Sequence, residues 1–249
     1  SYRVTRDRAG RWHVAFAHVP DAVGGSGDAS VVGIDRGVTV SAALSTGELL
    51  HAPRLTPGES KRLKVLQQRL ARAKRGSNRR EQTKRAIAKL KARERDRRKE
   101  WVEKTTTDLA RRFDVIRLEA LDVRAMTRSA RGSVEQPGVR VAQKRGLNRA
   151  IRRSGWGLLA ARLQHKAYGR VEQIPAAYTS QRCSTCGHIA PGNRKSQAVF
   201  ECQACTEGRC HADVNAARNI AAGRAVTARG DLADGRSANR EPQLATPAA

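Results

Sequence analysis

The order of apolar and polar side chains divides the chain into a strand-rich start, a helical middle and a mixed second half. Residues 2–19 alternate polar and apolar side chains around a turn at Gly10, which predicts a β-hairpin. A short apolar run at residues 31–34 predicts a buried strand, and alternation continues toward Leu44 before the next turn. We therefore expect a meander of strands ahead of the helical middle.

Residues 58–112 carry leucine and isoleucine at helical spacing, and a break at residues 76–78 divides them into two long helices. The charged side chains of this helical hairpin allow two interpretations. They form a solvated face, or they form a basic wall for a nucleic-acid backbone, and both can hold at once. Further along, we expect a strand at residues 113–119, an exposed loop at 128–149 and a helix at 151–168. A second strand at 171–174 and a last helix at 214–222 follow.

The chain is strongly basic. Its 49 lysine and arginine residues outnumber 23 acidic residues, and its formal net charge is +26. A compact state with this charge repels itself unless a polyanion neutralises it, so nucleic acid is the expected partner and salt should weaken the binding. The sequence has no apolar run near the ~20 residues of a spanning helix, and its first residues show no signal-peptide pattern. We expect a soluble, cytoplasmic protein with no membrane partner.

The cysteines are confined to one short region. A disulfide framework for a whole domain would be spread along the chain, so local metal binding is the better interpretation. The expected ligands form two Cys-x-x-Cys pairs: Cys183, Cys186, Cys202 and Cys205. Four thiolates at this spacing are typical of a structural zinc ribbon, in which no coordination position stays open for catalysis. Cys210 and His211 could substitute as ligands, but the two matched pairs favour leaving Cys210 free.

Three acidic side chains stand at the ends of predicted elements. Asp35 and Glu119 end apolar strands, and Asp213 opens the last helix. Each alone has an ordinary explanation: Asp35 as a turn acid, Glu119 as a surface acid, and Asp213 as a helix N-cap. Together they can converge on one point in an RNase H-like sheet. There they would bind two magnesium ions about 3.5 to 4 Å apart, which activate water and stabilise the leaving oxygen in phosphodiester cleavage.

The motifs around these residues resemble the TnpB, or OrfB, family of small bacterial insertion sequences, which is related to the type V CRISPR nucleases. The resemblance runs from about Val31 to Gly223. Its motifs lie at residues 33–37, 118–121, 146–149, 155–157, 178–187 and 212–220. It departs from the family at Thr206, where glycine usually follows the last ribbon cysteine.

The resemblance implies an α/β fold: an RNase H-like (RuvC) mixed sheet with a long helical hairpin and an inserted four-cysteine zinc ribbon. It implies that Asp35, Glu119 and Asp213 bind catalytic magnesium. It also implies a transposon-encoded DNA endonuclease that is directed by a guide RNA, so that base pairing reads the sequence of the target DNA. Such a protein is expected in the bacterial cytoplasm, at the nucleoid when bound to DNA.

On this reading the chain has five parts. Residues 1–22 form a β-hairpin, interpreted as the remnant of an N-terminal nucleic-acid-binding domain, and residues 29–177 form the nuclease core. The ribbon follows at 178–210, the final motif with its helix at 211–223, and a disordered tail at 224–249.

Two other functions compete with the endonuclease. Family members usually carry a longer N-terminal region, which favours a catalytically inactive nucleic-acid-binding protein of a transposon. A transposase that joins DNA ends is less favoured, because no tyrosine or serine nucleophile is indicated by the sequence.

Overall fold

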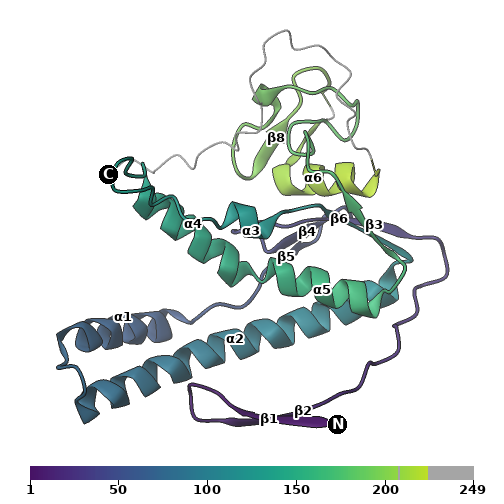
Figure 1. Cartoon of the computed structure of the whole chain (residues 1–249). Helices are drawn as coiled ribbons and strands as arrows, with labels where there is room; N and C mark the ends of the chain where they lie inside the picture. The colour runs from purple at the N-terminus through teal and green to yellow at the C-terminus, as the bar shows by residue number, and fades with distance from the viewer. Residues whose placement is uncertain (207, 224–249) are drawn as a thin grey trace.

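A five-stranded mixed sheet is the centre of the protein, in a computed structural model that describes residues 1–206 and 208–223 (Figure 1). The predicted tail at residues 224–249 therefore lies outside the described residues. The strand order is β5-β4-β3-β6-β7. The strands are β3 (Val31–Asp35), β4 (Ala42–Leu44), β5 (Leu49–Leu50), β6 (Val115–Glu119) and β7 (Val171–Ile174). Strands β3, β6 and β7 are parallel, whereas β4 and β5 continue from β3 as an antiparallel meander. The predicted α/β class with a mixed sheet is confirmed.

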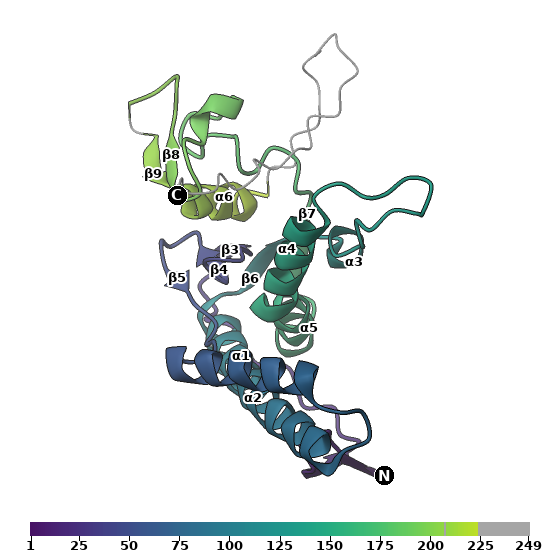
Figure 2. The same ribbon diagram turned by 90° about the vertical axis from the view of Figure 1, so that its left-hand side faces the viewer.

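Helices cover both faces of this sheet (Figures 1 and 2). On one face lie the two helices that supply most of the core, and on the other lies the last helix. The helices are α1 (Pro57–Arg72), α2 (Asn78–Arg112), α3 (Val123–Met126), α4 (Val141–Ser154), α5 (Trp156–Lys166) and α6 (Ala212–Ala221), with a 3-10 turn, η1 (Pro191–Asn193). None of the described helices is long and apolar enough to cross a bilayer.

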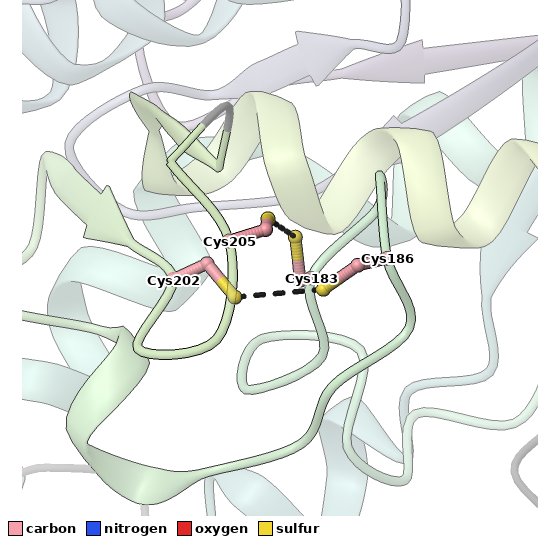
Figure 3. A group of neighbouring side chains, drawn as sticks. All are labelled: Cys183, Cys186, Cys202 and Cys205. Atoms are coloured by element: carbon pink, nitrogen blue, oxygen red, sulfur yellow. Dashed lines mark hydrogen bonds between the residues drawn. The ribbon is translucent and has the colours of Figure 1, made fainter.

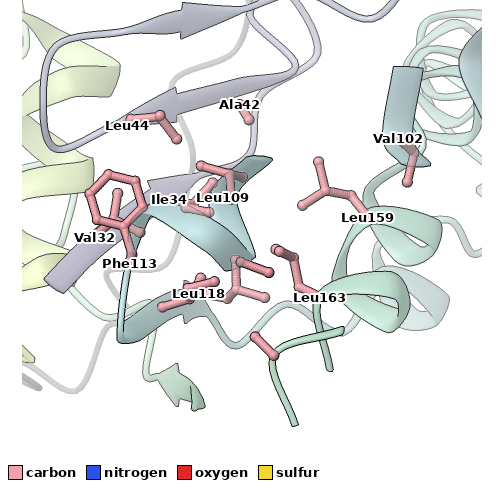
Figure 4. Close-up of a cluster of buried hydrophobic side chains, with 13 residues drawn as sticks. Val32, Ile34, Ala42, Leu44, Val102, Leu109, Phe113, Leu118, Leu159 and Leu163 are labelled. Atoms are coloured by element: carbon pink, nitrogen blue, oxygen red, sulfur yellow. The ribbon is translucent and has the colours of Figure 1, made fainter. Parts of the chain in front are cut away.

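The core lies between the sheet and helices α2 and α5 (Figure 4). Side chains alternate across a strand, so Val32 and Ile34 of β3 point to the same face. Both are fully buried, as are Ile116 and Leu118 of β6 beside them. Because these residues fill one face of the two central strands, their neighbours in sequence must occupy the other face.

That other face carries Gly33 and Asp35 of β3, with Arg117 and Glu119 of β6, and helix α6 packs over it. The register pairs Gly33 with Arg117, and Ile34 with Leu118. Arg117 also donates a hydrogen bond to the carbonyl of Ala221 at the end of α6. The sheet therefore holds α6 close against the strands whose last residues are acidic.

Gly33 is the residue that allows this close approach, and Gly33→Ala should destabilise the protein strongly. A Cβ at this position would lie 2.0 Å from the carbonyl oxygen of Ala217 and 2.3 Å from the amide nitrogen of Ala221. Both atoms are backbone, so α6 must shift as a whole. We expect a loss of about 3 kcal/mol in the free energy of unfolding, measured by urea denaturation.

Gly146→Ala is the matched control, because Gly146 lies in α4 and a Cβ there meets nothing within 4 Å. This change should be neutral or stabilise by up to ~1 kcal/mol. Equal effects of the two substitutions would contradict the close packing of α6 on β3.

The two helices expected between residues 58 and 112 are α1 and α2. Thr56 caps α1 in a reciprocal capping box with Glu59, and Ser77 caps α2. Leucine and isoleucine side chains join them in a small separate cluster: Leu63, Leu66, Ile87 and Leu90. Arg97 of α2 forms a two-pronged contact with Glu59, at 2.7 and 3.0 Å. The C-terminal half of α2 also buries Val102, Leu109 and Ala110 in the main core.

The expected loop at residues 128–149 is wrong in its second half, because helix α4 begins at Val141. Ile151 of this helix is buried and Val141 and Leu147 are half-buried, whereas Arg145 and Arg149 are exposed. The helix expected at 151–168 is therefore two helices. They meet at Gly155, whose φ of 79° is favoured only by glycine.

Strands β1 (Tyr2–Arg6) and β2 (Trp12–Phe16) form the expected hairpin. All ten of its strand residues are exposed. An ion pair of 2.6 Å between Arg11 and Asp96 joins the hairpin to α2. In the region of the cysteines, β8 (Val199–Glu201) and β9 (Arg209–His211) form a third, two-stranded sheet next to α6.

Candidate metal centres

The sheet brings Asp35 and Glu119 to the same edge. They follow Ile34 and Leu118, which are paired neighbours on the parallel strands β3 and β6, and they lie on the face that α6 covers. Parallel strands end at one edge of a sheet, so the two carboxylates project from adjacent positions. This arrangement follows from the strand pairing and needs no special loop.

Helix α6 supplies the third carboxylate. The C-terminal half of α6 contacts Gly33, so its first turn lies toward the strand ends. Asp213 lies in that first turn, and one of its oxygens is 3.8 Å from the position that a Cβ on Gly37 would occupy. The N-cap is His211, whose Nδ1 accepts a hydrogen bond from the Asp213 amide. The alternative role of Asp213 as the N-cap is therefore wrong.

The electrostatics of Asp35 show that the three acids lie near one another. Burial, and then the negative charges of Glu119 and Asp213, raise the pKa of Asp35 to about 8. Arg194 and Arg36 oppose this shift but do not cancel it. Burial and the neighbouring acids thus disfavour the charged form of Asp35, which is the condition that a bound cation relieves.

Four further residues hold these acids in place. Arg36 donates to the backbone carbonyls of Glu119 and Trp156, and the indole Nε1 of Trp156 donates to the carbonyl of Gly37 at 3.0 Å. Thr179 donates its hydroxyl to Glu119 at 3.2 Å. Arg194 contacts Asp213 through Nη2 and Oδ1 at 3.0 Å.

The donor set fits a hard divalent ion. Carboxylate oxygens are the ligands that Mg²⁺ prefers. The three acids are, however, more widely spaced than a single ion needs, because among the described residues only the four cysteines bring three or more ligand atoms within 4.8 Å of one another. Two ions about 4 Å apart, each with ligands at about 2.1 Å, tolerate outer ligands up to about 8 Å apart.

The four predicted cysteines gather into one compact group (Figure 3). Their sulfur atoms are 3.8 Å apart between Cys183 and Cys205, and 3.6 Å apart between Cys186 and Cys202. Four sulfurs around a zinc ion at about 2.3 Å would be roughly 3.8 Å apart, so the spacing fits tetrahedral zinc. Cys210 is not in this group.

Two thiols of this group, those of Cys183 and Cys205, have pKa values shifted in opposite directions. Burial acts to raise the pKa of Cys183, but backbone N–H groups of Cys186 and Thr185 lower it to about 7. Contact with the Cys186 thiol, and then burial and the other two cysteines, raise the pKa of Cys205 to about 12. A metal ion removes this conflict because it binds the thiolate form.

Buried asparagines connect the cysteine region to the sheet edge that carries Asp35 and Glu119, called the carboxylate edge below. The side chain of Asn193 is fully buried and donates to the carbonyls of Gln181 and His188, while it accepts from the amide of Gln203. On α6, the side chains of Asn215 and Asn219 both donate to the carbonyl of Arg182. The helix that carries Asp213 is thus bonded to the loop that leads into the first cysteine pair.

Sequence reasoning missed the supporting residues. Arg36 looks like any surface arginine, and only its place in the fold makes it buried. Thr179 and Arg194 are far from the acids in sequence, and nothing in their spacing predicts the contact. The one available signal was the run of asparagines at residues 215 and 219, four apart on α6, which is unusual for helix positions that face a core.

Two family models match the chain. Residues 22–130 match OrfB, described as "Probable transposase", and residues 156–220 match "Cas12f1-like, TNB domain". The first match includes Asp35 and Glu119, and the second includes the four cysteines and Asp213.

Relatives cover almost the whole chain. "Putative RNA-guided DNA endonuclease InsQ" of Escherichia coli (strain K12) is 40% identical over 241 residues, which are 94% of this chain and 59% of the relative. "Putative RNA-guided DNA endonuclease" of Streptomyces pristinaespiralis is 33% identical over 98% of this chain and 60% of the relative. The chain thus spans about three fifths of the length of these relatives. Among solved structures, a Cas12f1–sgRNA–target DNA complex matches with a TM-score of 0.44, 19% identity, and coverage of 88% of this chain and 55% of that one.

Proposed function

Because this chain is homologous to OrfB-type transposon proteins, we propose that it is the nuclease part of a transposon-encoded, RNA-guided DNA endonuclease. The observation that carries the proposal is the gathering of three carboxylates from distant segments at one sheet edge, in a chain of net charge +26. The sheet order, with three parallel strands and an antiparallel meander, supports an RNase H-like (RuvC) core. We further propose that the protein acts in the bacterial cytoplasm, at the nucleoid when bound to DNA.

In this proposal Asp35, Glu119 and Asp213 hold two magnesium ions. When bound, the ions supply a nucleophilic water and stabilise the leaving oxygen of the phosphodiester. Arg36, which directly follows β3, holds this strand end to the end of β6 through the carbonyl of Glu119 and to α5 through the carbonyl of Trp156. Thr179 orients Glu119, and α6 delivers Asp213. The four cysteines hold zinc as a structural ion.

The exposed basic side chains of three helices support binding of a nucleic-acid backbone. On α2 they include Arg79, Lys84, Arg85, Lys89, Lys91, Arg93 and Lys99. On α4 they are Arg145, Arg149, Arg152 and Arg153, and on α1 they include Lys61, Arg62, Lys64 and Arg69. Lysine and arginine contacts to phosphates bind without reading sequence, so target choice would depend on base pairing with the guide RNA.

The proposal is tested by expressing the chain together with the DNA that flanks its gene, purifying it, and sequencing the RNA that copurifies. The recovered RNA is then given a new guide segment, and a plasmid with the matching target is incubated with protein, RNA and Mg²⁺. We expect cleavage of the matching plasmid only, and no cleavage in EDTA. Salt-sensitive binding without cleavage, under any guide or metal, would instead support a nucleic-acid-binding protein that lacks catalysis.

A further inference from the structure

The ribbon region supplies a cation to the carboxylate edge. Arg194 directly follows η1, and its guanidinium Nη2 lies 3.0 Å from Oδ1 of Asp213. The exposed fractions of the two side chains are 15% and 7%. Little water screens this pair, so the attraction is stronger than in an ion pair on an open surface.

The backbone that carries Arg194 is fixed. Asn193, just before it, is fully buried and makes three hydrogen bonds to the two cysteine-bearing segments. Arg194 itself bridges to Phe200 of β8, which is also fully buried. The base of the side chain is therefore anchored. The guanidinium Nη2 donates to the carbonyl of Gln197 at 3.2 Å as well as to Asp213, so it can leave Asp213 by rotation of the side chain while the backbone stays in place.

Arg36, the other arginine near the acids, cannot leave in this way. Its side chain is buried with 7% exposed, and it bonds the carbonyls of Glu119 and Trp156. The two arginines therefore differ in kind. Arg36 is a permanent part of the core, whereas Arg194 contacts a carboxylate that the proposed function assigns to an ion.

We propose that Arg194 is a positioning residue that competes with divalent ions, so that its guanidinium must leave Asp213 before that carboxylate binds an ion. The inference rests on the proposed function, because it takes Asp213 as an ion ligand. The charge of Arg194 partly neutralises the three acids when no ion is bound, and it thereby lowers the affinity of the site for ions. The ribbon, besides bracing α6, thus sets how readily the nuclease site is loaded.

The test is a calorimetric titration of Mn²⁺ into the zinc-loaded full chain without nucleic acid. Arg194→Gln removes the competing charge and should bind Mn²⁺ roughly tenfold more tightly than wild type. Lys195→Gln is the matched control: it removes the same charge from the next residue, which is exposed. Its effect should stay below about twofold, because a solvated charge is screened.

Two more variants complete the test. Arg194→Lys keeps a cation but not the planar fork, so its affinity for Mn²⁺ should fall between those of wild type and Arg194→Gln. This variant also covers the case in which Arg194→Gln loses zinc. If neither Arg194 variant binds Mn²⁺ more tightly, the competition does not exist. Asp35→Asn should remove Mn²⁺ binding; if wild type and Asp35→Asn bind Mn²⁺ equally, the ions bind elsewhere and the proposed function fails as well.

Discussion

Asp35→Asn should abolish Mg²⁺-dependent DNA cleavage and at the same time stabilise the protein in EDTA. Removal of a carboxylate that we propose to hold the ions should cost several kcal/mol of transition-state stabilisation, so cleavage should fall at least about a thousandfold. The neutral amide has nearly the same shape as the acid, so packing at the end of β3 is preserved. Loss of activity with gain of stability is the expected signature of a site whose charges are gathered for function.

The pH dependence gives the sign of the stability effect. The pKa of Asp35 is about 8 in the folded protein against an ordinary value of 3.8, so the folded state binds this proton more tightly than the unfolded state. The free energy of unfolding should then fall as pH rises between these two values, by roughly 1 kcal/mol per pH unit. In the asparagine variant this loss is absent, so the variant should melt at a higher temperature than wild type at pH 8.

Thermal melts from pH 5 to 8.5, in EDTA and then in Mg²⁺, measure this difference. Magnesium should stabilise wild type at pH 8 and leave Asp35→Asn unchanged. The control is Asp108→Asn, which removes an exposed acid of α2 that pairs with Arg112 and lies outside the site. Two results would contradict the assignment of Asp35: cleavage by Asp35→Asn at the wild-type rate, or the same dependence of melting temperature on pH in Asp35→Asn and wild type.

Cys183→Ser should release the ribbon metal and disorder more than the ribbon. Cys183 is buried at 1% exposure, and its loss leaves three thiols around the ion. Zinc binding supplies on the order of 10 kcal/mol in small zinc domains, so several kcal/mol of stability should be lost here. Because Asn215 and Asn219 bond to the carbonyl of Arg182 in the adjoining loop, we also expect α6 to loosen over β3.

Cys210→Ser is the control, since Cys210 lies in the same small sheet but outside the four-sulfur group. Elemental analysis should find one zinc per chain in wild type and in Cys210→Ser, and none in Cys183→Ser. Amide hydrogen exchange should rise in α6 for Cys183→Ser alone. Zinc retained by Cys183→Ser, or lost from Cys210→Ser, would contradict the assignment of the ligands.

Sequence patterns predicted the parts of the fold that local spacing controls. The apolar strand at residues 31–34, the break at 76–78 and the paired cysteines each have a period or spacing that few other structures share. The boundary near Val141 was missed because arginine, lysine and glycine dominate that stretch, and they hide the helical spacing of its few apolar residues, of which Ile151 is buried. Amphipathic helices with large basic faces are easily taken for loops on composition alone.

The residues of the candidate site also fall into those that the sequence could predict and those that it could not. The three acids could be singled out because strand ends and helix starts are visible in the sequence. Arg36 and Arg194 could not be singled out, because their roles come from tertiary contacts. Arg36 contacts Trp156, more than 100 residues away, and Arg194 contacts Asp213, about 20 residues away. A charged residue that is buried by the fold has no local signature, and for such residues the structure adds what the pattern lacks.

The central claim is that Asp35, Glu119 and Asp213 share a pair of divalent ions. Anomalous scattering from crystals of the full chain soaked in Mn²⁺ tests this claim most directly. We predict two manganese peaks about 3.5 to 4 Å apart, bounded by these three carboxylates, with Arg194 turned away from Asp213. Manganese bound elsewhere, or absent from this edge in protein that still cleaves DNA, would contradict the account.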